Sequence, residues 1–303
     1  MKAEEIRKQL LELLIDFEDE LRSDNLRQKV LSLVPCYHQL RDLGKSLIPA
    51  EEARSARDRI LHYFLKYQGV VISGDELLVV SGIQEYARRI RELRVQFGWS
   101  IASGLTATQM AEENEFSLVD IDAAAMGTSD YILLSDEQDR DAAHRWNVAN
   151  EIRRENISVR DRLLKYFRKN IGQKITGEEL KYLARDKSEW ARRVRELRTE
   201  YGWPIVTKNT GRPDLEVGVY LLEADRQSPK HDRRIPDPVQ RNVLRRDDYK
   251  CTVCAWSHEE WNRSDPRHLE LHHQKTHATG GGNTEDNLVT LCTVCHDDIH
   301  RKK

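Results

Sequence analysis

The chain has 303 residues, of which 39% are hydrophobic and 33% charged, and its formal net charge is −2. This length allows two or three compact domains, and no apolar run approaches the ~20 residues that a transmembrane helix needs. The first twenty residues alternate charge with Leu and Ile at helical spacing, which excludes a secretory signal. We therefore expect a cytoplasmic protein that has no membrane partner.

The N-terminal segment, residues 1–54, is predicted to be helical, because apolar residues recur at helical spacing in LLELLIDF and in VLSLVPCYHQLRDLGKSL. Such a segment could cover the domain that follows it or form a dimer contact. We expect the packing role.

The middle of the chain contains an internal repeat. The sequence ARDRILHYF, which starts at Ala56, recurs as VRDRLLKYF from Val159, and QEYARRIRELRVQFGWSI recurs as SEWARRVRELRTEYGWPI. The offset is 103 residues at the start of the copies and 104 at the end, so one residue has been inserted. One fold is therefore expected twice, over residues 55–150 and 151–228.

Each copy is predicted to contain three helices followed by a hairpin. In the second copy residues 160–169 and 188–201 carry apolar stripes, and Thr176 with Glu179 has the spacing of a helical capping box. Residues 205–206 and 219–222 have the composition of strands. This order predicts a winged helix-turn-helix, whose third helix would enter the major groove of DNA.

The third helix of each copy carries four matched arginines outside its apolar stripe. They could bind phosphates or guanine edges, or they could form Arg–Glu pairs on a solvated face. Because the pattern is duplicated, we expect DNA contacts from Arg88, Arg89, Arg91, Arg94, Arg192, Arg193, Arg195 and Arg198.

The first copy has a long link between its predicted hairpin strands, from Ser103 to Asp130. The segment between Leu105 and Ala142 holds ten acids and one base and so carries −9, which leaves +7 for the remainder of the chain. DNA-binding proteins ordinarily present a basic surface. The rest of the chain, outside the acidic segment, could present such a surface. The link itself is expected to be an extended wing or a mobile lid.

Cysteine spacing predicts a zinc site near the end of the chain. Four of the five cysteines form two CxxC pairs separated by 37 residues, and in a reducing compartment such pairs indicate metal rather than disulfides. Four thiolates suit a closed, tetrahedral Zn²⁺ site of the structural type. The predicted ligands are Cys251, Cys254, Cys292 and Cys295.

Between and after these pairs lie LELHHQKTHATGGGNTEDNLVTLC and HDDIHRKK. The adjacent His272 and His273 are followed by Asn287 after fourteen residues, His296 after nine more and His300 after a further four. In this order, and with a CxxC pair on each side, the segment resembles the HNH (ββα-metal) nuclease family in its four-cysteine, zinc-containing branch. We expect residues 229–303 to form a basic linker and this nuclease domain, which makes the whole chain a multidomain α+β protein.

The resemblance implies a role for each motif residue. His273 would be the general base that activates a water, while His272 and His296 would bind one divalent ion, Mg²⁺ or Mn²⁺, that neutralises charge on the phosphate. Asn287 would fix the loop that carries the base. His300, one turn after His296, would be a third ligand or a phosphate donor, and Lys275 would contact phosphate. A strand is expected before His272, a Gly-rich hairpin at residues 280–282, and a closing helix over residues 287–300.

These expectations favour a restriction-type endonuclease that cuts double-stranded DNA. Whether its winged helices select a plain sequence or a modified base stays open. The alternatives are a DNA-binding regulator whose HNH domain is only a zinc module, and a repair or mobile-element nuclease. One HNH unit cuts one strand, so double-strand cleavage needs either a dimer or two successive nicks, and we expect a homodimer.

Overall fold

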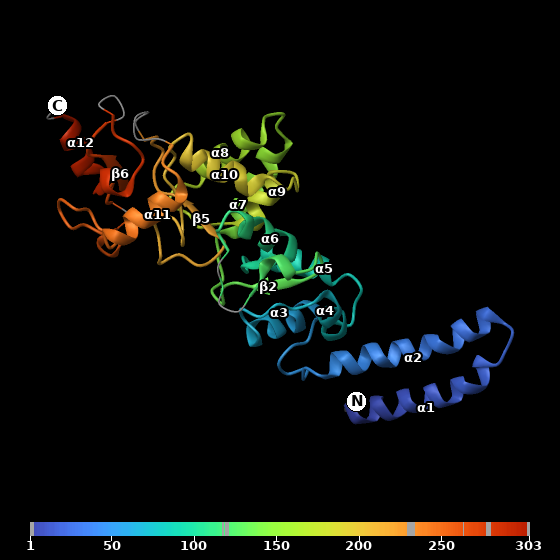
Figure 1. Ribbon diagram of the computed structural model, residues 1–303. Helices are drawn as coiled ribbons and strands as arrows, with labels where there is room; N and C mark the ends of the chain where they lie inside the picture. Colours follow the sequence, from blue (N-terminus) through green and yellow to red (C-terminus); the bar gives the residue numbers. More distant parts are fainter. Residues whose placement is uncertain are drawn as a thin grey trace. The chain divides into compact units, whose positions relative to one another are not determined.

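The computed structural model describes residues 3–116, 118, 121–228, 234–262, 264–276 and 280–301, and it combines many helices with small antiparallel sheets (Figure 1). It divides into two compact units, Met1–Ser103 with Gly127–Ala143, and Gly104–Met126 with His144–Lys303. Among the helices of the described residues, none has both the length and the apolar character needed to cross a bilayer.

The first unit begins with two long helices, α1 (Ala3–Leu21) and α2 (Leu26–Ser46), which pack side by side as a hairpin (Figure 1). Asn25 caps α2 by accepting a hydrogen bond from the backbone N–H of Gln28. The end of α2 lies against α4 (Gly74–Ser81) at Gly44, where a Cβ atom would come within 2.5 Å of the Val79 carbonyl oxygen. The N-terminal segment therefore packs against the first copy of the repeat, as expected.

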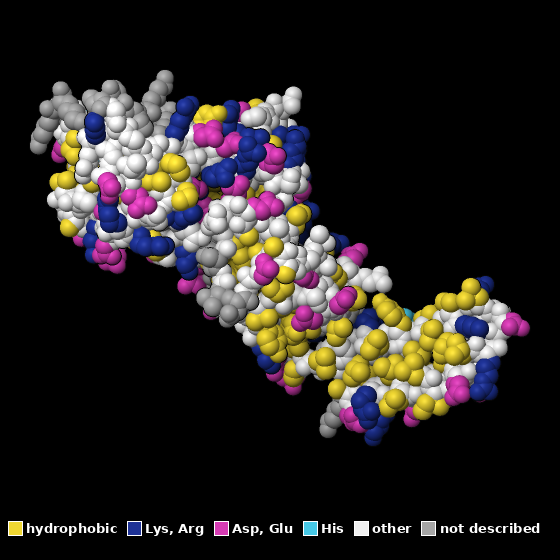
Figure 2. Space-filling model, viewed as in Figure 1, with side chains coloured by type: hydrophobic (Ala, Val, Ile, Leu, Met, Phe, Trp, Pro, Cys, Tyr) yellow, Lys and Arg dark blue, Asp and Glu magenta, His cyan; other side chains and the backbone are white. Residues whose placement is uncertain are grey.

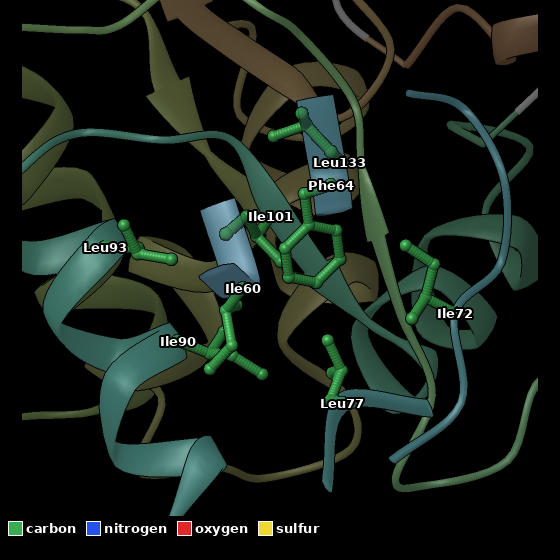
Figure 3. Packing of buried hydrophobic residues seen from close by; sticks show 8 residues of the cluster. All are labelled: Ile60, Phe64, Ile72, Leu77, Ile90, Leu93, Ile101 and Leu133. Carbon is green, nitrogen blue, oxygen red and sulfur yellow. The ribbon is translucent and has the colours of Figure 1, made fainter. Parts of the chain in front are cut away.

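The first copy consists of α3 (Ala56–Lys66), α4 and α5 (Tyr86–Val95), followed by the antiparallel strands β1 (Ile101–Ser103) and β2 (Tyr131–Leu133). A single bridge joins Ile72 to Tyr131. Residues from the three helices and both strands meet in one buried core (Figure 3).

The second copy has the same order of elements. It consists of α8 (Val159–Lys169), β3 (Ile175–Thr176), α9 (Gly177–Leu183), α10 (Trp190–Thr199), β4 (Ile205–Thr207) and β5 (Val219–Leu222), and its strands pair in the order β3-β5-β4. Both halves of the predicted capping box between Thr176 and Glu179 are present. The predicted hairpin strands are confirmed.

Corresponding apolar positions are buried in both copies, and this shared core explains why the repeat is visible in the sequence. The buried residues of the first copy are Ile60, Phe64, Ile72, Leu77, Ile90, Leu93, Ile101 and Leu133, and those of the second are Leu163, Phe167, Ile175, Leu180, Val194, Leu197, Ile205 and Leu222. A buried arginine is also repeated. Arg59 donates to the carbonyl oxygens of Val80 and Ser81, and Arg162 donates to that of Leu183.

Most of the acidic link, Gly104–Met126, belongs to the second unit. It contains α6 (Gly104–Glu112), which packs against α9 and α10, and a short 3-10 helix (Ala123–Ala125). Gln109 of α6 accepts a hydrogen bond of 2.7 Å from the buried indole of Trp190 in α10. The link was expected to be an extended wing or a lid; the structure shows instead a helix that covers the second copy. Helix α7 (Ala142–Arg154) follows, and its Arg145 forms a buried ion pair with Glu179.

The C-terminal part begins with α11 (Asp237–Arg246), where a basic linker was expected; residues 229–233 of that linker lie outside the described residues. Val243 and Leu244 of α11 are buried against Leu271 and Leu288, so this helix is part of the domain. The domain continues with β6 (Leu269–His273), a 3-10 helix (Glu285–Asn287), β7 (Leu288–Cys292) and α12 (Thr293–Arg301).

The predicted closing helix over residues 287–300 is therefore wrong in its first half. Residues 288–292 pair in register with β6, because LVTLC is a short apolar run with the β-branched Val289 and Thr290, and four of its five residues are buried. The strand predicted before His272 is confirmed.

Candidate active site

The four predicted zinc ligands lie together. Cys251 and Cys254 form one turn, Cys292 ends β7 and Cys295 lies in the first turn of α12, and their sulfur atoms are all within 4.8 Å of one another. The distance between the Cys254 and Cys292 sulfurs is 3.7 Å, close to the ~3.8 Å edge of a tetrahedron with Zn–S bonds of ~2.3 Å. Burial opposes ionisation of the Cys251 thiol, but nearby backbone N–H groups lower its pKa to about 7. The donor set therefore fits a structural Zn²⁺ ion.

Three histidines form a second cluster, between β6 and α12. The Nε2 atom of His296 lies 3.0 Å from Nδ1 of His272 and 3.1 Å from Nε2 of His300. His272 and His296 are buried, and His300 is half-buried. His300 reaches the other two because it lies one helical turn after His296. The structure thus brings together the two predicted ligands and the third candidate.

Glu270 orients this cluster, and sequence reasoning missed it. Its Oε2 lies 2.6 Å from Nδ1 of His296, and its Oε1 lies 3.2 Å from Nε2 of His268. Burial raises the pKa of the Glu270 carboxyl, but the hydrogen bonds from these two histidines outweigh it and hold that pKa well below its usual range. The carboxylate can only accept, so His296 carries its proton on Nδ1 and its Nε2 lone pair faces the other two rings.

His273, the predicted general base, is buried at the end of β6. Its Nε2 lies 2.8 Å from the side-chain oxygen of Asn283, whose amide nitrogen donates to the carbonyl oxygen of Arg234 at 3.0 Å. Because the amide nitrogen of Asn283 donates to Arg234, its amide oxygen faces His273 and accepts a hydrogen bond from that ring. The neutral ring then has its lone pair on Nδ1, the form that can accept a proton. Asn283 was also not identified from the sequence.

Asn287 fixes the loop between β6 and β7, as the family resemblance implies. Its side chain accepts from the backbone N–H of Lys275 and donates to the carbonyl oxygens of Lys275 and Gly282, each at 2.9 Å. The two sides of this loop lie so close together that position 281 must be glycine, because a Cβ atom on Gly281 would lie 1.7 Å from the Lys275 carbonyl oxygen. The side chain of Lys275 is exposed on this loop.

The arginines of α10 are engaged within the protein. Arg198 is buried, with its guanidinium 2.9 Å from Glu115 and 2.5 Å from Asp237. Burial alone would lower its pKa, but these two carboxylates raise it, so Arg198 stays charged. It has no exposed surface to offer to DNA, and the expectation of a DNA contact from Arg198 does not fit this structure. Arg195 forms a 2.7 Å ion pair with Glu113.

Arg192 and Arg193 both pair with Glu196, at 3.3 and 2.7 Å. Helix α10 therefore shows the Arg–Glu pairing that was the alternative to DNA contacts.

Helix α5 of the first copy is different. Arg91 and Arg88 are exposed, and the contacts of Arg88 with Glu85 and Glu92 are loose, at 3.8 and 3.5 Å. Arg89 is paired more tightly, at 2.7 Å from Glu92. Arg94 donates to the carbonyl oxygen of Ile101 at 2.6 Å and lies over the ring of Tyr131. The two copies thus share a fold but differ in the surface of the third helix.

Comparison with known proteins agrees with this geometry. A family model described as HNH endonuclease matches residues 251–302, which contain both CxxC pairs and the histidine cluster. A second, described as KpnI N-terminal domain, matches residues 57–134 and 160–223, which correspond to the two copies of the repeat. No curated protein and no solved structure matches the chain significantly.

Proposed function

We propose that this chain, in which an HNH endonuclease domain follows two segments similar to the KpnI N-terminal domain, is a restriction-type endonuclease that hydrolyses phosphodiester bonds in double-stranded DNA. The observation that carries this proposal is the convergence of three imidazole nitrogens next in sequence to a buried histidine that is held in one tautomer. A structural zinc site alone would require neither feature.

His272, His296 and His300 would hold one divalent ion, because each offers a ring nitrogen to the same small volume. Such an ion supplies charge neutralisation at the scissile phosphate and at the departing oxygen. Three imidazoles suit a transition ion better than Mg²⁺, which prefers oxygen ligands. The four cysteines would hold Zn²⁺ and stabilise the domain without taking part in the reaction.

The protein's own residues prepare the nucleophile. His273 would accept the proton of the attacking water on Nδ1, while Asn283 holds the ring through Nε2. Asn287 keeps the loop beside β6 in place through its three hydrogen bonds. The exposed ammonium group of Lys275 on this loop would bind a phosphate of the substrate.

The two copies of the repeat would select the DNA site. Three helices with a strand pair, and the strand order β3-β5-β4 in the second copy, suit a winged helix, whose third helix enters the major groove. We assign this contact to α5 of the first copy, through the exposed Arg88 and Arg91. Cutting both strands would use a homodimer of a cytoplasmic enzyme, since each chain has one HNH domain.

Cleavage of plasmid and phage DNA, methylated and unmethylated, tests the proposal with wild type and His273→Ala in Mg²⁺ or Mn²⁺. Discrete fragments are expected from wild type, with the His273→Ala rate lower by about 10²–10⁴ because the general base is lost. His38→Ala, an exposed histidine of α2, serves as the matched control. If wild type binds DNA but cuts none of these substrates with either ion, the chain is a DNA-binding regulator instead.

A further inference from the structure

The α1–α2 hairpin exposes an apolar face that nothing in the described chain covers. On α2 five of the seven exposed large apolar residues recur every three or four positions, the spacing of one continuous helix face, and Leu31 and Val34 border this face. On α1 a second row runs along the same hairpin (Figure 2). This apolar stripe comprises Leu26, Val30, Leu33, Tyr37 and Leu40 of α2 with Leu11, Leu14 and Leu21 of α1. Leu26 is 73% exposed and Leu40 57%, so the stripe does not contribute to the protein's own core.

Near the end of α2, the same face packs against another helix, α4. Gly44 continues the spacing four residues after Leu40, and it lies against Val79 of α4. Before Gly44, the described residues add one polar contact to the stripe, in which the Tyr37 hydroxyl accepts from the Gln84 side chain at 3.3 Å, and the leucines of the stripe stay exposed. A contiguous exposed apolar face on a helix pair ordinarily marks a site of association.

The charges of the two helices identify the partner. Helix α1 has seven acids and two bases, a net charge of −5, whereas α2 has four bases and one acid, a net charge of +3. Two copies related by a twofold axis would place α1 of one hairpin over α2 of the other, which brings opposite charges together twice. Placing α1 over α1 would instead bring two acidic helices together.

The size of the surface also suits a second copy. A 21-residue helix is ~30 Å long, and two helices side by side are ~20 Å wide. Each hairpin thus offers roughly 600 Å², and the pair would bury about 1,200 Å², the lower end of the range for specific interfaces.

We propose that the apolar stripe of the α1–α2 hairpin is the dimer interface of this protein, and that two hairpins form an antiparallel four-helix bundle with α1 facing α2 of the partner subunit. Its consequence for double-strand cleavage rests on the proposed function, but the association itself does not. The bundle would bring together two chains that each carry one HNH domain.

Sedimentation of the full-length protein between about 1 and 100 µM tests this directly, because an interface of this size supports binding in the micromolar range or tighter. We expect wild type to be a dimer and Leu40→Glu, which buries a charge in the interface, to dissociate at least tenfold more readily. His38→Glu adds the same charge to an exposed position on the same helix outside the stripe, and it should remain dimeric. Helix content by circular dichroism checks that each variant is folded.

A monomeric wild type over this whole range would overturn the proposal, as would a Leu40→Glu variant that dimerises like His38→Glu. The facing of α1 and α2 predicts in addition that 1 M NaCl weakens the dimer, since it screens exposed charge pairs, and tighter association in salt would contradict that arrangement. In cleavage assays Leu40→Glu should nick supercoiled plasmid but yield less linear product than His38→Glu. No nicking by any form would refute the proposed function and leave the sedimentation result standing.

Discussion

Glu270 shows how much of a metal centre can depend on a residue that is not itself one of the candidate ligands. It accepts from His296 at 2.6 Å and fixes the tautomer that leaves Nε2 available. Loss of such an outer carboxylate typically costs 10–100-fold in metal affinity. We expect Glu270→Gln to bind Mn²⁺ about 10–100-fold more weakly, because an amide is a poorer acceptor and cannot accept from both His268 and His296 through its nitrogen.

Calorimetric titration of the zinc-loaded, full-length protein with Mn²⁺ measures this effect without reference to catalysis. Glu260→Gln is the control, since Glu260 is exposed in the same domain. Equal Mn²⁺ affinity in the two variants would show that the tautomer of His296 does not depend on Glu270.

At this same scale the sequence predicted part of the site. The resemblance to the HNH family, which rests on the order of the histidines and Asn287, implied the cluster and the loop contacts that the structure shows. Glu270 could have been found as well, because residues two apart in a strand share one face, and it lies two before His272. Asn283 could not, because its bond to His273 depends on the loop conformation and on a carbonyl of Arg234, 49 residues earlier.

At the scale of elements, α10 is held in place by charge as well as by its apolar stripe. Arg198 joins it to Glu115 in the acidic link and to Asp237 at the start of α11. Replacing Arg198 with Met would leave two buried carboxylates without their cation, and breaking a buried pair in this way costs about 3–5 kcal/mol. We expect the free energy of unfolding of the second unit to fall by about this amount.

Urea denaturation followed by circular dichroism measures the loss. Arg192→Met on the same helix is the control, because the Arg192 side chain is exposed and Glu196 keeps its ion pair with Arg193, so the loss should be at most ~1 kcal/mol. If both variants unfold at the same urea concentration, the charges around Arg198 do not hold these elements together.

The helices and strands also differ in how far the sequence predicts them. The duplicated helices were predictable because matched apolar residues fill the same core twice. The position of α6 was not, since the acidic link that contains it indicates a solvated segment, and only a tertiary contact such as Gln109 with Trp190 shows where it packs. The strand β7 was mistaken for helix because LVTLC is short and leads directly into the helix that carries His296.

At the scale of the whole molecule, the two copies of the repeat have the same fold but different surfaces. Arg195 and Arg198 of α10 are neutralised by Glu113 and Glu115, whereas Arg91 of α5, which matches Arg195, is exposed. This contrast favours a division of labour in which the second copy supports the nuclease domain and the first contacts DNA. Such a division makes the effect of matched substitutions unequal.

We expect Arg88→Ala/Arg91→Ala to weaken binding to a DNA duplex that the enzyme cleaves by at least tenfold. The slope of log affinity against log salt concentration should fall by about one to two, because binding with fewer phosphate contacts releases fewer counterions. Arg192→Ala/Arg195→Ala removes the same charge from the matched positions of the second copy, but these side chains already pair with Glu196 and Glu113. It should therefore change affinity by less than about threefold. Fluorescence anisotropy with Ca²⁺ in place of the catalytic ion measures the DNA affinity of both variants. Equal losses of affinity would mean that both copies of the repeat bind DNA, and that the arginines of the second copy leave their carboxylate partners on binding.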